Sequence, residues 1–230
     1  MIEKNIFQTW CTRDLHPTIQ NKIDSIKALN PTYIHLIYTD NEMDEFVNIN
    51  FAGEIAYFYN KLNIIVAKVD FWRYLVLYKY GGVYLDMDSS INRPLDELIK
   101  DTDQAIITAE GNPEKYVQWA LIFKKGHPIL KKTIELIVEN IKYNKYPNDI
   151  LKMTGPVVYS EAINIVHKDL YGSPFQHSTI NNNTDITFSN YRIYGKDYND
   201  FFSFKYPEAD LLYINKKHWR EEQEEKSLLK

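Results

Sequence analysis

The residues best suited to chemistry are two aspartates two positions apart, Asp86 and Asp88, at the end of a short apolar run over residues 83–85. Gly81 and Gly82 precede that run and are expected to end a helix before it. In an α/β sheet, ligands bind at the carboxyl ends of the strands. Two carboxylates there can hold Mn²⁺ or Mg²⁺ and, through the ion, a phosphate group. The segment therefore predicts a metal-dependent site for a phosphate-bearing ligand.

The spacing of the two acids is a weak signal without its context. With 31 acidic residues in 230, chance gives roughly four acid-x-acid pairs, a false-positive rate that any short motif meets. The chain holds six such pairs. Only Asp86/Asp88 ends an apolar strand run and follows a glycine pair, so we select this pair as the candidate active centre.

A second charged pair, Asp70 and Arg73, lies one helix earlier. The two residues are three positions apart in the predicted helix 64–80, so they share a face. One interpretation is a local salt bridge, worth a few tenths of a kcal/mol at a surface. The other is that the helix directs both side chains at the ligand of the aspartate pair, since arginine can pair with phosphate and aspartate can accept from a sugar hydroxyl. The spacing alone leaves both open.

Around these residues the sequence alternates predicted strands with predicted helices. The predicted strands cover residues 5–10, 33–38, 83–88, 104–109 and 117–123, with short runs at 186–188 and 211–214. The predicted helices cover residues 17–29, 42–47, 54–62, 64–80, 128–142 and 157–167. In helix 64–80 we expect one broad apolar face, and residues 220–230 read as a charged tail that is frayed or helical. The order predicts an α/β sandwich with a largely parallel central sheet, in a single domain over 1–230.

The composition limits the binding partners and the cellular compartment that we expect for the protein. A net charge of −4 argues against nucleic acid as the main partner, because binding a phosphate backbone needs a basic surface. A single cysteine excludes an internal disulfide and a cysteine-based metal cluster. No run approaches 18 apolar residues, so no transmembrane segment is expected. The start of the chain lacks a signal-peptide pattern, so a cytoplasmic location is expected.

Two segments resemble a known enzyme family. Residues 67–75 (AKVDFWRYL) and 80–88 (YGGVYLDMD) resemble the signature of DXD-containing glycosyltransferases of family 32, which includes yeast-type initiation mannosyltransferases and capsular polysaccharide enzymes. The pattern is also similar to the glucosyltransferase domain of clostridial toxins. The resemblance implies the GT-A fold, a nucleotide-sugar donor, Mn²⁺ or Mg²⁺ as cofactor, and retention of configuration at the transferred sugar.

The resemblance continues along most of the chain. Residues 6–10 resemble the first strand of the family, and residues 126–128 and 153–156 resemble its later blocks before two helices. Residues 217–219 resemble its closing histidine-containing block. The likeness is dense over 66–88 and sparse over 165–210. The family's closing block usually continues to a Ser-Trp pair, whereas this chain has Arg220 after Trp219. An asparagine common before the middle strand is replaced by Gln118-Trp119.

Three of the carried-over residues form the metal end of the implied site. Asp88 would coordinate the metal directly, and the metal would bridge the donor diphosphate. Asp86 would lie beside the donor ribose and touch the metal, directly or through water. His218 is the candidate third ligand. Oxygen ligands favour Mg²⁺ or Mn²⁺ over zinc.

Four further residues form the nucleotide and sugar end. The resemblance implies that Asp70 and Arg73 hold the hydroxyls of the transferred sugar, and that Tyr84 contacts the nucleotide or phosphate. It implies that Trp10 stacks on the nucleotide base; the alternative for Trp10 is a place in the core. Asp70, Arg73 and Asp88 are thus the candidate catalytic residues.

The implied reaction moves a hexose or N-acetylhexosamine from a UDP- or GDP-sugar to a glycan, polysaccharide or other hydroxyl acceptor. A divalent cation would stabilise the charge that develops on the leaving diphosphate. Retention needs either a carboxylate nucleophile or attack on the same face, guided by the leaving phosphate. No residue stands out as the nucleophile, and Glu110 is only a speculative acid on the acceptor side.

Two other functions compete with this one. Phosphatases of the haloacid dehalogenase type also place Asp-x-Asp at a strand end, but their first aspartate is a nucleophile close to the N-terminus. Here 85 residues precede it, Ser89-Ser90 follow, and that chemistry does not explain Asp70 and Arg73. A catalytically inactive nucleotide- or glycan-binding module is the second alternative, and the intact acidic and basic residues argue against it.

Overall fold

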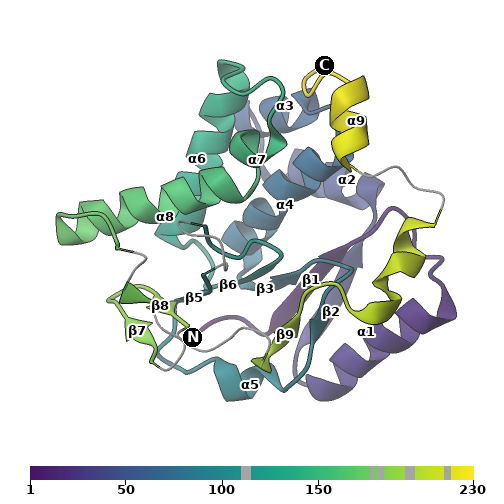
Figure 1. The fold of residues 1–230 in the computed structure, drawn as a ribbon, viewed down its shortest axis with the longest axis vertical. Helices are drawn as coiled ribbons and strands as arrows, with labels where there is room; N and C mark the ends of the chain where they lie inside the picture. Colours follow the sequence, from purple (N-terminus) through teal and green to yellow (C-terminus); the bar gives the residue numbers. More distant parts are fainter. Residues whose placement is uncertain (110–114, 177–178, 181–183, 195–199, 215–218) are drawn as a thin grey trace.

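A central sheet of seven strands organises the computed structural model, which describes residues 1–109, 115–176, 179–180, 184–194, 200–214 and 219–230 (Figure 1). Its strands lie in the order β2-β1-β3-β6-β5-β8-β7. Their bounds are β1 Asn5–Thr9, β2 Ile34–Tyr38, β3 Gly82–Leu85, β5 Ala105–Ile107, β6 Ala120–Phe123, β7 Ile186–Thr187 and β8 Arg192–Ile193.

Most strands of this sheet run in one direction. β1 pairs in parallel with β2 and β3, and β5 pairs in parallel with β8. β6 is antiparallel to both β3 and β5, and β7 is antiparallel to β8. Five of the seven strands therefore point the same way, with β6 and β7 reversed. The expected α/β class with a largely parallel sheet is confirmed.

Helices cover both faces of the sheet. The helices have these bounds: α1 Pro17–Leu29, α2 Asp40–Asn50, α3 Glu54–Lys61, α4 Ile65–Tyr80, α5 Leu95–Leu98, α6 Pro128–Lys142, α7 Ile150–Met153, α8 Pro156–Tyr171 and α9 Trp219–Glu225. Phe7 and Tyr84 point into a large apolar cluster with α2, α4, α6 and α8. Their strand neighbours Ile6 and Val83 point into a second cluster with α1 and α5 (Figure 1). This alternation follows from the two-residue period of a strand.

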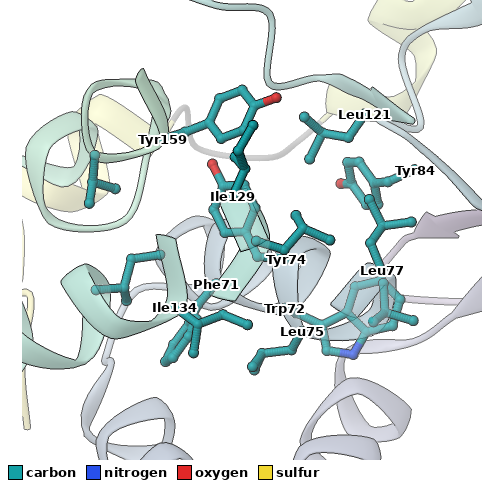
Figure 2. Close-up of a cluster of buried hydrophobic side chains, with 14 of the residues drawn as sticks. Phe71, Trp72, Tyr74, Leu75, Leu77, Tyr84, Leu121, Ile129, Ile134 and Tyr159 are labelled. Carbon is teal, nitrogen blue, oxygen red and sulfur yellow. The ribbon is translucent and has the colours of Figure 1, made fainter. Parts of the chain in front are cut away.

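Helix α4 lies at the centre of the larger layer and is buried on all sides along its middle. Figure 2 shows Phe71 and Tyr74 of α4 among Ile129 of α6, Tyr159 of α8 and Leu121 of β6. The expectation of a single apolar face was wrong. A helix packed between the sheet and other helices is apolar all round, and Asp70 and Arg73 are therefore buried with it.

The two glycines that follow α4 in the chain are needed for different structural reasons. Gly81 ends the helix, as predicted, with φ of 68° and its N–H bonded to the Leu77 carbonyl at 2.8 Å. Gly82 begins β3 with φ of 114°, and a Cβ atom there would lie 2.5 Å from the Asn5 carbonyl oxygen of β1. Both positions favour glycine, because a side chain would be strained at these angles and would collide at position 82.

A small second sheet joins the segment after the aspartate pair to the C-terminal part. β4 (Ser90–Ile91) pairs antiparallel with β9 (Phe202–Ser203). The 3₁₀ segment η3 (Pro207–Tyr213) follows β9. The predicted strand at 211–214 was therefore wrong. η3 starts at a proline, and its Ala209 and Leu212 fill a third apolar cluster at the three-residue spacing of such a turn.

The end of the chain folds back onto the domain. The expected tail is helical in α9, and Leu228 beyond it is buried. The N–H of Lys230 donates to the Lys61 carbonyl at 2.8 Å, and the N–H of Asn63 donates to the Leu228 carbonyl at 2.9 Å. In the described part of the chain, no helix is long and apolar enough to cross a membrane.

Candidate active site

The two aspartates lie in the turn that follows β3. The backbone N–H of Asp86 donates to the Trp119 carbonyl at 2.8 Å, which extends the pairing with the β6 side by one residue. The chain then turns, and the N–H of Ser89 donates to the Asp86 carbonyl at 3.0 Å. Asp86 thus lies at the carboxyl end of a central strand, and Asp88 lies within the tight turn, as predicted for a ligand site.

Arg73 of α4 connects the helix pair to the aspartate pair. Its Nη2 atom lies 3.1 Å from Oδ1 of Asp70 and 3.1 Å from Oδ1 of Asp86. Its Nη1 donates to the Gln118 carbonyl at 3.2 Å, and its guanidinium lies 4.7 Å from the centre of the Tyr84 ring. The Asp70–Arg73 salt bridge therefore exists, but it is buried and shared with Asp86 rather than an isolated surface pair.

Asp70 is buried among polar partners. Gln118 Nε2 donates to Oδ1 of Asp70 at 3.3 Å, and the Thr154 hydroxyl donates to Oδ2 at 3.3 Å. Burial raises the pKa of Asp70 to about 6, and the guanidinium of Arg73 opposes that rise. Because burial disfavours the charged form of Asp70, a cation or hydroxyl donor that contacts the carboxylate stabilises that charged form.

Asp86 keeps one carboxylate oxygen available. Tyr84 donates its hydroxyl to Oδ1 at 2.6 Å, and Arg73 contacts the same oxygen. No contact from the described residues falls on Oδ2, and the side chain remains 27% exposed. Burial raises the pKa of Asp86 to about 6; Arg73 lowers it and the neighbouring charge of Asp88 raises it.

Asp88 is held from the C-terminal part of the chain. The Tyr213 hydroxyl donates to its Oδ2 at 2.9 Å, and the Ser89 hydroxyl lies 3.3 Å from its Oδ1. The Tyr213 ring packs edge-on against Trp10, with ring centres 5.9 Å apart. Tyr206, directly before η3, also contacts Asp88, since its N–H donates to the Asp88 carbonyl at 3.1 Å. Trp10, half-buried just beyond β1, is thereby placed beside Asp88.

The two aspartates fit a divalent cation in charge and ligand type. Asp88 is buried but has no ion pair with any described residue, and only hydroxyl groups satisfy its carboxylate. Two carboxylates with one open oxygen on Asp86 form a hard oxygen donor set, which suits Mg²⁺ or Mn²⁺. Among the described residues no group of three or more candidate metal ligands occurs, so further ligands would come from the substrate, from water or from the remaining residues.

The structure brings most of the predicted site residues together. Asp70, Arg73, Tyr84 and Asp86 are in mutual contact through Arg73, while Trp10 and Asp88 are joined through Tyr213. His218 and Glu110 lie outside the described residues.

Three residues at the site were missing from the sequence-based set. The sequence marks Gln118 only as a departure from the family pattern and Thr154 only as part of a block before a helix, yet both contact Asp70. Tyr213 contacts Asp88 from 125 positions away, and the sequence around it predicts a strand. Nothing in the local pattern marks it as a site residue.

Comparison with known proteins supports the resemblance. Residues 17–105 match the family described as glycosyltransferase sugar-binding region containing DXD motif. This segment holds Asp70, Arg73, Asp86 and Asp88. The chain is therefore similar to this family of DXD-containing glycosyltransferase sequences over residues 17–105.

Similar curated proteins include two yeast enzymes. The chain is 30% identical over 160 residues to inositol phosphoceramide mannosyltransferase 3 of Schizosaccharomyces pombe, which covers 69% of this chain and 44% of that protein. It is 23% identical over 210 residues to the initiation-specific alpha-1,6-mannosyltransferase of Candida albicans, covering 74% and 54% respectively. The chain thus spans about half the length of the curated relatives it matches.

Two solved structures share the fold. The PaToxG glycosyltransferase superposes with a TM-score of 0.58 at 21% identity, covering 74% of this chain and 72% of that one. The glycosyltransferase domain of the YGT toxin gives 0.52 at 9% identity, covering 76% and 80%. The expected GT-A fold is confirmed.

Proposed function

We propose that the chain is a metal-dependent glycosyltransferase that moves a sugar from a UDP- or GDP-sugar donor to a hydroxyl of a glycan or similar acceptor. The observation that carries this proposal is the continuous set of contacts from Asp70 through Arg73 to Asp86, next to Asp88, at the end of a central strand. The set falls inside the segment that matches the DXD family.

The identity of the donor sugar is also a proposal. The similar yeast proteins are named as mannosyltransferases, and this favours mannose among the hexoses. GDP-mannose is therefore the first donor to test, with UDP-glucose and UDP-N-acetylglucosamine as alternatives for the same pocket.

At the metal end, Asp86 and Asp88 would hold the ion through carboxylate oxygens. Bound Mn²⁺ or Mg²⁺ would stabilise the negative charge of the leaving nucleoside diphosphate. Tyr84 and Arg73 both contact Oδ1 of Asp86. Together they fix the orientation of this carboxylate through Oδ1 and leave Oδ2 for the ion. His218 stays the proposed third ligand.

At the sugar end, Asp70 and Arg73 would bind hydroxyls of the transferred sugar, as the family resemblance implies. The positive charge of Arg73 also offsets the negative charges of Asp70 and Asp86, with which it forms ion pairs. Trp10 would stack on the base beside Asp88. We propose retention of configuration, with Asp88 and Arg73 among the groups that stabilise the separating charges.

The experiment that tests this function is donor turnover. Purified protein is incubated with each nucleotide sugar, with Mn²⁺, with Mg²⁺ or with EDTA, and released nucleoside diphosphate and free sugar are measured. Metal-dependent release supports the proposal. Metal-dependent binding of UDP or GDP without any release favours the inactive binding module. Release of phosphate from a simple phosphomonoester, with no action on nucleotide sugars, favours the phosphatase.

A further inference from the structure

A pocket of about 420 Å³ lies along one face of α8. The residues that line it include Val157, Ser160, Asn164, Ile165 and Lys168 of α8, together with Lys115 across from the helix. Their spacing of three and four positions places the α8 residues in one row. The volume falls within the range of roughly 300–1,000 Å³ that is common for small-molecule sites.

The pocket begins next to the proposed sugar end of the active site. The hydroxyl of Ser160 accepts the N–H of Tyr116 at 3.1 Å. Tyr116 precedes Gln118 by two residues, and Gln118 contacts Asp70. Two residues of chain span at most about 7 Å. Thr154, which also contacts Asp70, directly precedes the Gly155 cap of α8.

From that end the pocket runs away from the metal site. Val157 and Lys168 stand at its two ends along α8, about 16 Å apart at 1.5 Å of rise per residue. An occupant of this length would place one end near Asp70 and the other near Lys168. An extended acceptor fits this geometry with its reacting hydroxyl toward the Asp70 end.

The lining has one apolar strip and two cationic groups. Val157 and Ile165 offer apolar surface for the faces of sugar rings. Neither Lys115 nor Lys168 forms an ion pair with any described residue, and Glu161 is the acidic lining residue. Asn164 also lines the pocket, although its Oδ1 atom is buried from solvent.

We propose that this pocket binds the acceptor, and that the acceptor is a saccharide carrying an anionic group, phosphate or carboxylate, at a distance from the reacting hydroxyl. Lys115 and Lys168 bind the anion, and Val157 and Ile165 contact the face of a sugar ring. The proposal rests on the proposed glycosyltransferase function, since it takes the Asp70 end as the place where the sugar is transferred.

The test measures binding and not turnover. Mannose 6-phosphate and mannose are titrated into wild-type protein saturated with Mn²⁺ and GDP, followed by ligand-observed NMR. The same titrations are made with the double variant Lys115→Gln/Lys168→Gln. The matched control is Lys124→Gln/Lys125→Gln, which removes the same charge from two exposed lysines before α6. The affinity of each variant for GDP with Mn²⁺ reports that the site is folded.

We expect wild type and control to bind the phosphorylated sugar about tenfold more tightly than mannose, in keeping with two accessible charge contacts. The pocket variant should lose that preference while its affinity for GDP stays unchanged. Equal binding of the two sugars by wild type without lysine-dependent binding to phosphatidylinositol vesicles, or an undiminished preference in the pocket variant, would overturn the proposal.

A vesicle-binding experiment distinguishes two sources of the anionic group, a lipid headgroup and a soluble saccharide. Phosphatidylcholine vesicles with and without phosphatidylinositol are sedimented with wild type and with both variants. Lysine-dependent binding confined to phosphatidylinositol vesicles would support the pocket with a lipid headgroup as the source. Lysine-dependent binding of the free sugar phosphate would support a soluble acidic saccharide. Because every readout is binding, failure of donor turnover would refute the proposed function without deciding this test.

Discussion

The hydroxyl of Tyr213 donates a 2.9 Å hydrogen bond to Oδ2 of Asp88, while its ring lies edge-on to Trp10. One side chain from η3 thus contacts both the proposed metal ligand and the proposed base platform. We expect Tyr213→Phe to weaken Mn²⁺-dependent GDP binding by about 0.5–1.5 kcal/mol, the usual net value of one hydrogen bond. The ring contact with Trp10 is kept in this variant.

Tyr206→Phe is the matched control for this prediction. Tyr206 also donates its hydroxyl to the same turn, but to the Met87 carbonyl at 3.1 Å rather than to a carboxylate. Calorimetric titration of both variants checks the prediction. If removing the Tyr213 hydroxyl tightens binding, then that hydroxyl competes with the metal instead of orienting its ligand.

The second prediction concerns the metal itself. Asp88→Ala should abolish the Mn²⁺-dependent part of nucleotide binding, because one of the two described carboxylates proposed to hold the ion is lost. Asp101→Asn, at the exposed member of the rival Asp101/Asp103 pair, should bind as wild type does. Titrations in Mn²⁺ and in EDTA measure the difference, and an Mn²⁺-dependent affinity that survives in Asp88→Ala would refute the site assignment.

Trp10 provides a third prediction. Trp10→Ala should weaken nucleotide binding by about 1–3 kcal/mol, the range measured for base–aromatic stacking, whereas Trp10→Phe should retain much of the affinity. The melting temperature is followed in parallel, since Trp10 also packs against the cluster around Ile19 and Leu212. A large loss of melting temperature with unchanged nucleotide affinity would place Trp10 in the core only.

Arg73 is expected to affect both stability and turnover. Removing one member of a buried ion pair costs about 3–5 kcal/mol, and Arg73→Ala leaves both Asp70 and Asp86 without their guanidinium partner. Arg73→Lys keeps the charge but not the planar contact with two carboxylates. We expect Arg73→Lys to fold and to lose about 100-fold in turnover, with only a small change in GDP affinity.

The same measurements on Arg73→Lys separate the sugar from the phosphates. Donor turnover is followed by released nucleoside diphosphate, and GDP affinity by calorimetry in Mn²⁺. Equal losses in turnover and in GDP affinity would move Arg73 from the sugar end to the diphosphate end of the site.

The parts of the site that could be predicted from the sequence are local in the chain. A helix that ends at Gly81, followed by a strand and two aspartates, is specified within residues 64–88. Their spacing and the family resemblance were enough to nominate Asp70, Arg73, Asp86 and Asp88. The direction of most strands also followed from the alternation of helices and strands.

The contacts that could not be predicted join distant segments. Tyr213 reaches Asp88, and Gln118 and Thr154 reach Asp70, only because the tertiary fold brings η3, the start of β6 and the end of α7 to these aspartates. The continuous apolar run over 211–214 fits a strand as well as a 3₁₀ turn. The burial of Arg73 was also hidden, since a charged pair three residues apart is usually solvated.

The absence of a side chain at Gly82 allows β3 to lie close to β1, and this spacing has a consequence for the site. Trp10 follows β1 and Asp86 follows β3, and these parallel strands pair directly, with Ile6 opposite Val83 and Phe7 opposite Tyr84. Adding a methyl group at position 82 would force the Asn5 carbonyl away and shift the two strands apart. The separation between the groups that would hold the base and the diphosphate is therefore set at the far end of the strands. In Gly82→Ala we expect the protein to bind its preferred donor less selectively, although no residue that touches the donor has changed.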